Sequence, residues 1–367
     1  MKILLLGEYS NVHATLAQGL RELGHTVVVA SDGDSWKDYA RDVDLKRPSL
    51  GKLSTALYYL KLRWKFRRFR GFDVVQLINP VFLPLRAERI MPFYHFLRHH
   101  NGSVFLGAFG MDYYYVKACL DCKTFRYSDF NMGSEIRHSS ENDAWIRDWL
   151  KGPKGDINRA MAADADGIVA GLYEYYASYK KDFNDKLRYI PFPIILKDKR
   201  HEPDGKRVRF FIGIQKARNA YKGTDIMLRA LERVKAAYPD RCDIVKVESV
   251  PFEEYVKLLN GSDVLLDQLY SYTPAMNALE AMAHGMVVVS GGEPESYELL
   301  GDTDLQPIVS VQPTEDDVYR QLETVVLHPE KLPQMSADSR AYIARYHDHV
   351  KVAKQYIDFW TSRKKQS

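Results

Sequence analysis

The stretch VLLDQLYSYTPAMNALEAMAHGMVVVSG, residues 264–291, reads as a strand, a loop, a helix and a second strand. Thr273 and Pro274 predict the start of the helix, because threonine caps helices and proline favours their first position. The helix should run to about His284, where Gly285 can end it. The helix is apolar on nearly every side, which is typical of a helix buried between the layers of an α/β fold.

Glu280 is the only carboxylate in that helix. A carboxylate in such a position is costly unless it is bonded to a partner. A ligand with phosphate and hydroxyl groups meets this requirement, with its phosphate on the amides near Met276 and Asn277 and its hydroxyls on Glu280. A pairing of Glu280 with a buried lysine or arginine is an equal alternative.

The segment LEAMAHGMVVVSGGEPE resembles the nucleotide-sugar motif of the retaining GT-B glycosyltransferases of family four. That motif has two glutamates separated by seven residues, followed by A-M-A-x-G-x-P-V-V. Glu280 matches the second glutamate, which in the family holds the donor ribose. Tyr272 stands at the position of the first glutamate, so the resemblance places it and the neighbouring Thr273 among the donor-binding candidates. Val287 replaces the motif proline. The resemblance implies an α/β protein of GT-B fold, with two Rossmann-like domains whose parallel sheets face a central cleft.

The composition suits a protein of two α/β domains, since 367 residues exceed one typical core. A net charge of +4 argues against a nucleic-acid partner. Cys119 and Cys122 have no second pair to complete a zinc site, and with Cys242 they are expected to be reduced thiols. The sequence shows neither a signal peptide nor a stretch that could span a bilayer, so we expect a cytoplasmic protein.

The N-terminal segment predicts a strand at Lys2–Leu6, a helix and a second strand, but it lacks G-x-G-x-x-G. That absence argues against a nicotinamide oxidoreductase. LRELGHTVVVAS matches the family pattern L-x-x-x-G-H-x-V-x-V. Ser10, Asn11 and His13 lie in the first loop, where the resemblance implies that they face the acceptor side. His13 could equally be a helix-start residue without a chemical role.

A basic segment with aromatic residues follows at residues 50–70, in GKLSTALYYLKLRWKFRRFR. Such a segment is typical of contact with an anionic membrane surface, which would suit a lipid-linked acceptor. A solvated helix whose long side chains cover apolar surface is the alternative, and RNA is a weaker one. Its cations are Lys61, Arg63, Lys65, Arg67, Arg68 and Arg70.

A later loop reads Phe109-Gly110-Met111-Asp112 where family members often carry a histidine. Asp112 follows a predicted parallel strand and is the substitute that could serve as a base, or else a turn or cap residue. Residues 123–154 have no clear period and predict an insertion or a lid beside the cleft.

We expect an N-terminal domain at residues 1–196, a linker at 197–206 and a C-terminal, nucleotide-sugar-binding domain at 207–344. The resemblance implies that the last helix, at about 345–367, packs back on the first domain. Trp360 and Phe359 should anchor it.

The second domain begins with a buried strand that leads to Gly213, and a basic loop and a helix follow. Cations beside the amides of a helix start make a diphosphate site. The family segment G-x-x-x-x-x-K-G places its lysine at Lys222, and its arginine at Arg218 in preference to Lys216. We expect the loop at 249–251 to hold the nucleotide base.

The resemblance therefore implies transfer of a sugar from a nucleotide diphosphate sugar to a glycan or lipid-linked acceptor, with retention and without a metal or cofactor. Arg218, Lys222 and the amides after Thr273 would stabilise the leaving diphosphate, and Asp112 could assist the acceptor hydroxyl. Three alternatives stay open: an epimerase of the same fold, a non-catalytic sugar-nucleotide or glycan-binding protein, and, least favoured, a dehydrogenase.

Overall fold

The chain folds into two compact units in a computed structural model, which describes residues 1–48, 51–196, 198, 201–214, 219–248, 252–301 and 303–363. Unit 1 comprises Met1–Asp121, Asp143–Pro193 and His349–Ser367. Unit 2 comprises Cys122–Asn142 and Ile194–Asp348. The chain therefore passes between the units at four places, and each unit has its own sheet.

Unit 1 is built on a seven-stranded parallel sheet in the order β3-β2-β1-β4-β5-β8-β9. Its strands are buried on both faces, as expected for a parallel sheet covered by helices. The strand order reverses beside β1, so the loops after β1 and β4 meet at the carboxyl edge. The strands are β1 (Lys2–Leu6), β2 (Thr26–Ser31), β3 (Val43–Asp44), β4 (Val74–Leu77), β5 (Ser103–Ala108), β8 (Gly167–Ala170) and β9 (Leu187–Tyr189).

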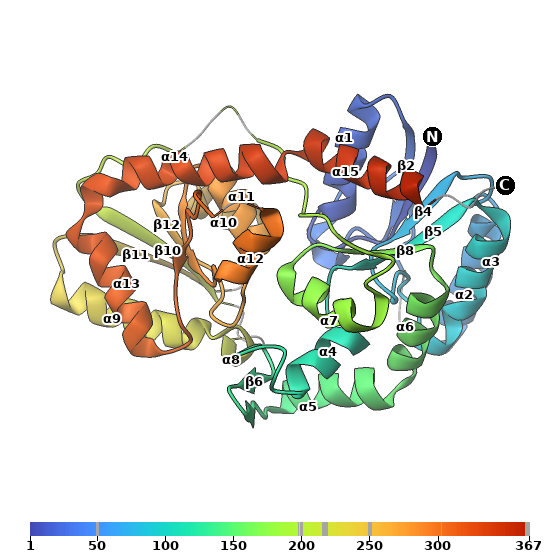
Figure 1. Cartoon of the computed structure of the whole chain (residues 1–367), viewed down its shortest axis with the longest axis horizontal. Helices are drawn as coiled ribbons and strands as arrows, with labels where there is room; N and C mark the ends of the chain where they lie inside the picture. The colour runs from blue at the N-terminus through green and yellow to red at the C-terminus, as the bar shows by residue number, and fades with distance from the viewer. Residues whose placement is uncertain are drawn as a thin grey trace. The chain divides into compact units, whose positions relative to one another are not determined.

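The last helix belongs to unit 1, where α15 lies beside α1 (Figure 1). Gly19 permits this contact, because a Cβ there would lie 2.3 Å from the His349 carbonyl oxygen. Trp360 is fully buried and its Nε1 donates to Gln76, while Phe359 packs on Phe105. The helices of this unit are α1 (Val12–Glu22), α2 (Lys52–Phe66), α3 (Met91–His100), α4 (Tyr113–Leu120), α5 (Ser140–Ile146, across the boundary), α6 (Pro153–Asp164), α7 (Tyr173–Phe183) and α15 (His349–Ser362).

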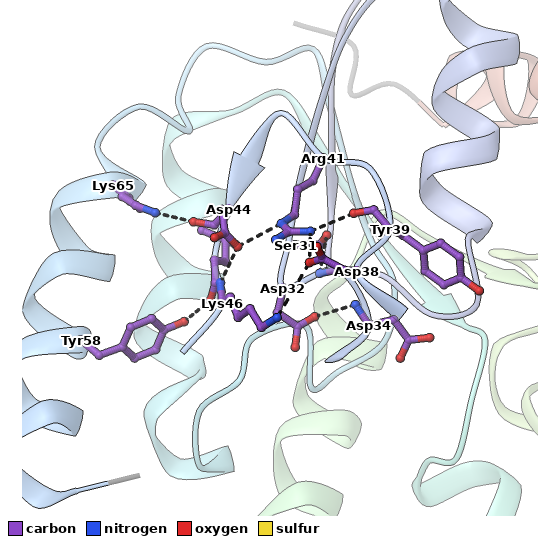
Figure 2. A network of polar contacts seen from close by, with 12 residues as sticks. Ser31, Asp32, Asp34, Asp38, Tyr39, Arg41, Asp44, Lys46, Tyr58 and Lys65 are labelled. Atoms are coloured by element: carbon purple, nitrogen blue, oxygen red, sulfur yellow. Dashed lines mark hydrogen bonds and ion pairs between the residues drawn. The ribbon is translucent and has the colours of Figure 1, made fainter. Parts of the chain in front are cut away.

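A polar network fixes α2 against β3 and the loop before it (Figure 2). The Tyr58 hydroxyl donates to the Leu45 carbonyl at 2.6 Å, and the Lys65 ammonium donates to the Asp44 carbonyl. Arg41 lies between the carboxylates of Asp38 and Asp44, each at 3.0 Å. The rotation of α2 about its axis is therefore set, and with it the face that the helix leaves exposed.

Unit 2 has a five-stranded parallel sheet in the order β11-β10-β12-β13-β14, so the predicted α/β class with two parallel sheets is confirmed. Its core forms between the sheet and helices that include α9 and α13, which lie side by side (Figure 1). Its strands are β10 (Val208–Ile214), β11 (Cys242–Glu248), β12 (Val264–Leu266), β13 (Val287–Ser290) and β14 (Val309–Ser310). Its helices are α8 (Asn219–Lys222), α9 (Thr224–Ala237), α10 (Phe252–Leu259), α11 (Met276–Ala283), α12 (Pro294–Leu300), α13 (Glu315–Leu327) and α14 (Leu332–Tyr342).

The observed division differs from the predicted boundaries in two segments. Cys122–Asn142, predicted within the first domain, makes its contacts in unit 2 and contains the short strands β6 (Asn131–Met132) and β7 (Glu135–Ile136). The described part of the predicted linker also packs on unit 2, where His201 bonds to Asp263 at 2.6 Å. Long-range polar contacts, which no local pattern reveals, are the reason for both differences.

Helix α11 begins later than the predicted start at Thr273 and Pro274, with Ala275 as its N-cap. The preceding residues are held as a loop, because the Glu293 amide donates to the Tyr272 carbonyl at 3.0 Å. The predicted end is confirmed, since the helix stops before His284 and Gly285.

Gly291→Ala should destabilise unit 2 by roughly 2 kcal/mol or more, because an added Cβ would lie 1.4 Å from the Ser271 carbonyl oxygen. Gly261→Ala is the matched control, since its Cβ would meet no atom closer than 3.6 Å. Urea unfolding of the two variants measures the difference. Equal midpoints would contradict the close approach of the two loops.

Candidate functional site

Those predicted donor-binding residues that the structure describes lie around the carboxyl edge of the unit 2 sheet. Strand β10 lies between β11 and β12, so the strand order reverses there, and open α/β sheets bind ligands at such a point. Gly213 is the second-to-last residue of β10 and packs against Tyr255, whose ring a Cβ at this position would meet at 3.0 Å. The edge thus combines the end of β10 with the loops after β12 and β13.

Lys222 ends α8, one residue before Gly223. Gly223 has a φ of 70° and a Cβ there would lie 2.7 Å from Leu269, so the two loops touch. The Leu269 amide also donates to the Lys222 carbonyl at 2.9 Å. Within the described part of the chain the Lys222 ammonium has no hydrogen-bond or ion-pair partner. The lysine is therefore available to an anion beside the first turn of α9.

Asn277 is fixed at the start of α11 by two bonds that the sequence did not predict. Its Nδ2 donates to Asp267 at 2.9 Å, and its Oδ1 accepts from the Tyr255 hydroxyl at 3.0 Å. The second carboxylate oxygen of Asp267 is buried without a partner among the described residues. Asp267 directly follows β12, so its position after a strand was the sequence signal that could have identified it.

The remaining predicted residues around α11 have different exposures. Glu280 is partly buried, as is Asn277, whereas Met276, Thr273 and Tyr272 are buried. The Tyr272 hydroxyl accepts the Arg126 backbone N–H at 2.7 Å. The side chain at the position of the family's first glutamate is therefore bonded to the segment Cys122–Asn142.

Glu293 is a second residue that sequence reasoning missed. The residue is 4% exposed, and its carboxylate accepts hydrogen bonds from Tyr127, from Arg126 at 2.7 Å and from Gln312 at 2.9 Å. Three bonds offset the cost of removing a carboxylate from water. The residue follows Gly291 and Gly292 in the motif segment, which was its only signal in the sequence.

The predicted diphosphate residues Lys216 and Arg218 and the predicted base loop 249–251 lie outside the described residues. Their assignments stay predictions.

In unit 1 the predicted residues Ser10 and Asn11 adopt left-handed backbone conformations, with φ of 50° and 71°. The Ser10 amide donates to Asp34 at 2.9 Å, and its hydroxyl accepts from Lys37 at 3.2 Å. Both residues are partly exposed in the loop after β1.

His13 is fully buried and packs against Phe109. Its Nδ1 donates to the Gly7 carbonyl at 2.8 Å, and burial lowers its pKa to about 4, so the ring is neutral near pH 7. Glu8 caps the same helix by accepting the amides of His13 and Ala14, and burial raises its pKa to about 8. These contacts give His13 a packing role in unit 1.

Asp112 is the N-cap of α4 and is fully buried. One carboxylate oxygen accepts the Tyr115 amide at 2.9 Å and the other accepts the Tyr179 hydroxyl at 2.8 Å. Burial raises its pKa to about 7, and these bonds only partly oppose that shift. The pKa would suit a base, but both oxygens are already bonded.

Comparison with known proteins supports the glycosyltransferase prediction. Residues 207–358 match the model of a family described as glycosyl transferase-like. No relative was found among curated protein sequences.

Solved structures share the fold along the whole chain. The Anabaena protein Alr3699/HepE, in complex with UDP and glucose, matches with a TM-score of 0.62 and 12% identity over 99% of this chain and 100% of its own. WaaG, a glycosyltransferase involved in lipopolysaccharide biosynthesis, matches with a TM-score of 0.56 and 12% identity, over 98% of this chain and 100% of its own. The UDP-GlcNAc 2-epimerase from Neisseria meningitidis, bound to UDP-GlcNAc, matches with a TM-score of 0.55 and 13% identity, over 99% of this chain and 100% of its own. The predicted GT-B fold is confirmed, and family four specifically stays a prediction.

Asp112→Asn should change how stability depends on pH. A raised carboxyl pKa stabilises the folded state below about pH 4, and that contribution is lost as pH rises through 7. The variant lacks this loss, so its stability relative to wild type should increase by up to about 4 kcal/mol from pH 4 to pH 8. Thermal melting across this range measures the difference, and parallel curves would show that Asp112 titrates normally.

Proposed function

We propose that this protein is a GT-B glycosyltransferase that moves a sugar from a nucleoside diphosphate sugar to the hydroxyl of a glycan or lipid-linked acceptor. The match of residues 207–358 to a glycosyl transferase-like family carries the proposal, because this range contains the edge where Lys222, Asn277 and Glu280 lie. UDP is the first nucleotide to test, since Alr3699/HepE was solved with it.

The donor diphosphate would lie beside Lys222 and the first turn of α9, because the N-terminal end of a helix favours an anion. Lys222, with Arg218 and Lys216, would stabilise the charge that develops on the leaving diphosphate. Glu280 would accept the ribose hydroxyls. The chemistry then depends on fixed positive charge, and we propose that it proceeds with retention and without a metal ion or cofactor.

The acceptor hydroxyl must lose its proton, and the departing phosphate is the group that we propose takes it. Asp112 is the alternative base, with a pKa raised to about 7. Its two bonds to Tyr115 and Tyr179 would have to break first, which disfavours this route.

An epimerase is the second candidate, because the Neisseria meningitidis enzyme shares the fold over 99% of this chain. A non-catalytic binding protein is the third, because Tyr272 and Phe109 replace polar groups of the family. Incubation with UDP-sugars separates the three: an acceptor-dependent release of UDP indicates transfer, a change of the sugar without acceptor indicates epimerisation, and binding alone indicates neither.

We propose that the enzyme works at the inner, cytoplasmic face of an anionic membrane, through a surface of α2. Leu57, Leu60 and Trp64 share one face of this helix and are 60%, 62% and 55% exposed. Lys61 lies on the same face, and the Arg68 guanidinium stacks on the Trp64 ring at 4.9 Å. Exposed apolar side chains among cations fit a lipid interface. Among the described helices, none is long and apolar enough to cross a membrane.

Lys222→Ala and Glu280→Ala should each weaken UDP binding by about 10- to 100-fold, the usual effect of losing a hydrogen bond to a charged group. Isothermal titration of folded protein measures the affinities. Lys331→Ala, an exposed lysine of the same unit, is the control. Wild-type affinity in the Lys222 variant would refute the diphosphate assignment.

Replacing Leu57, Leu60 and Trp64 with glutamine should reduce binding to vesicles containing 30% phosphatidylglycerol by at least about tenfold, because the apolar contact is lost. Binding of wild type should also weaken as salt rises. Leu327→Gln, at an exposed leucine of unit 2, should bind as wild type does. If wild type does not cosediment with these vesicles at low salt, the membrane proposal fails.

A further inference from the structure

The segment Cys122–Asn142, called the strap below, has a defined structure that its own internal contacts maintain. The β6–β7 hairpin gives it a frame. The Asn131 side chain bonds to the carbonyls of Phe125 and Gly133, at 3.0 and 3.1 Å. The Asn142 side chain bonds to the carbonyls of Asp129 and Arg137, at 2.9 and 2.7 Å. The Nδ2 groups of both asparagines thus donate to carbonyls within the strap, and these bonds give it a defined shape.

The strap holds the loop after β12 through Tyr272. The Arg126 amide donates to the Tyr272 hydroxyl at 2.7 Å, and the ring of Tyr127 lies 4.9 Å from that of Tyr272. Phe125 also packs on Tyr272, with the two ring centroids 5.7 Å apart. The Arg137 guanidinium lies 3.4 Å from the ring of Tyr270 in the same loop. This loop leads directly into α11.

The strap also holds the loop after β13, through Glu293. Two of the three donors to this buried carboxylate, Arg126 and Tyr127, come from the strap. Arg126 bonds Glu295 as well. The Glu293 amide also donates to the Tyr272 carbonyl, which joins the loop after β13 to the loop after β12. Arg126, which bonds both residues, therefore holds the two loops together.

The third contact is with α8. The Asp129 carboxylate accepts the Tyr221 hydroxyl at 2.6 Å, and Phe130 packs edge-on against the Tyr221 ring. Tyr221 is the residue before Lys222, whose carbonyl accepts the Leu269 amide. The strap therefore reaches both the lysine side and the α11 side of the donor edge.

We infer that the strap is a positioning element of the donor site: Asp129 sets Lys222 through Tyr221, and Arg126 and Tyr127 set the loop before α11 through Tyr272 and Glu293. This inference rests on the proposed function. Tyr272 then serves as an anchor for the strap at the position of the family's first glutamate, and it does not contact the donor. Groups held before a ligand arrives bind it with a smaller ordering cost.

Tyr127→Phe and Tyr221→Phe test the inference, because each removes one strap hydrogen bond and keeps the ring. Each should weaken UDP binding about 3- to 10-fold in isothermal titration. Tyr238→Phe is the matched control: it removes a 2.8 Å bond to Glu323 in the same unit, at the opposite end of α9 from Lys222. The control should leave the affinity unchanged.

A second measurement separates positioning from general destabilisation. Hydrogen exchange of the amides 269–277 in ligand-free protein should become faster in the two strap variants and not in Tyr238→Phe. In addition, Tyr221→Phe should have little further effect on UDP affinity once Lys222 is alanine, because it acts through that lysine. A purely structural role would give the same loss in both backgrounds.

The outcomes distinguish the two proposals. If wild type binds UDP and Lys222→Ala weakens binding as expected, but the strap variants behave as Tyr238→Phe does in both measurements, the strap inference is wrong and the donor site stands. If wild type binds no UDP, both proposals are overturned. Loss of affinity with unchanged exchange would also overturn the strap inference, since the loop would not have moved.

Discussion

The buried carboxylate of Glu293 joins three parts of unit 2 that are distant in the sequence. Its acceptor oxygens take hydrogen bonds from the strap and from Gln312, and its amide bonds to Tyr272. A buried charge is tolerated only with such partners. Loss of one partner would leave the Glu293 carboxylate with a desolvation cost that the remaining bonds do not offset. The geometry of the donor edge therefore depends on a residue that need not touch a ligand.

The sheets were predictable because both are parallel and covered on both faces. Such strands appear as short apolar runs, and the observed bounds of β1 and β12 agree with the runs in the sequence. The strap was not predictable in the same way. Arg126 and Glu293 are 167 residues apart, and no local periodicity links a polar insertion to a loop in the other half of the chain.

Polar residues after strands were predicted to face ligands, and the structure gives several of them a local partner instead. Asp112 caps α4, and the amide of Ser10 bonds to Asp34. Glu8, for which no ligand was predicted, caps α1 in the same way by bonding its first amides. Helix starts and ligands compete for the same carboxylates, because both offer unsatisfied donors at the carboxyl edge of a sheet. Sequence alone does not tell which donor is nearer. Lys222 and Asn277 lie at the unit 2 edge, and their part in donor binding stays a prediction.

Two of the departures from the family pattern, at Phe109 and Tyr272, have one physical feature in common. Phe109 packs against His13 and Phe192, and Tyr272 packs against Tyr127 and Phe125. Each aromatic ring stands where the family has a polar group, and each is integrated into its own unit. Restoring a glutamate at 272 alone would place a carboxylate among these rings and remove the acceptor of the Arg126 amide. The family residue would therefore fit only if the strap changed with it, so the motif departure and the strap are one structural unit.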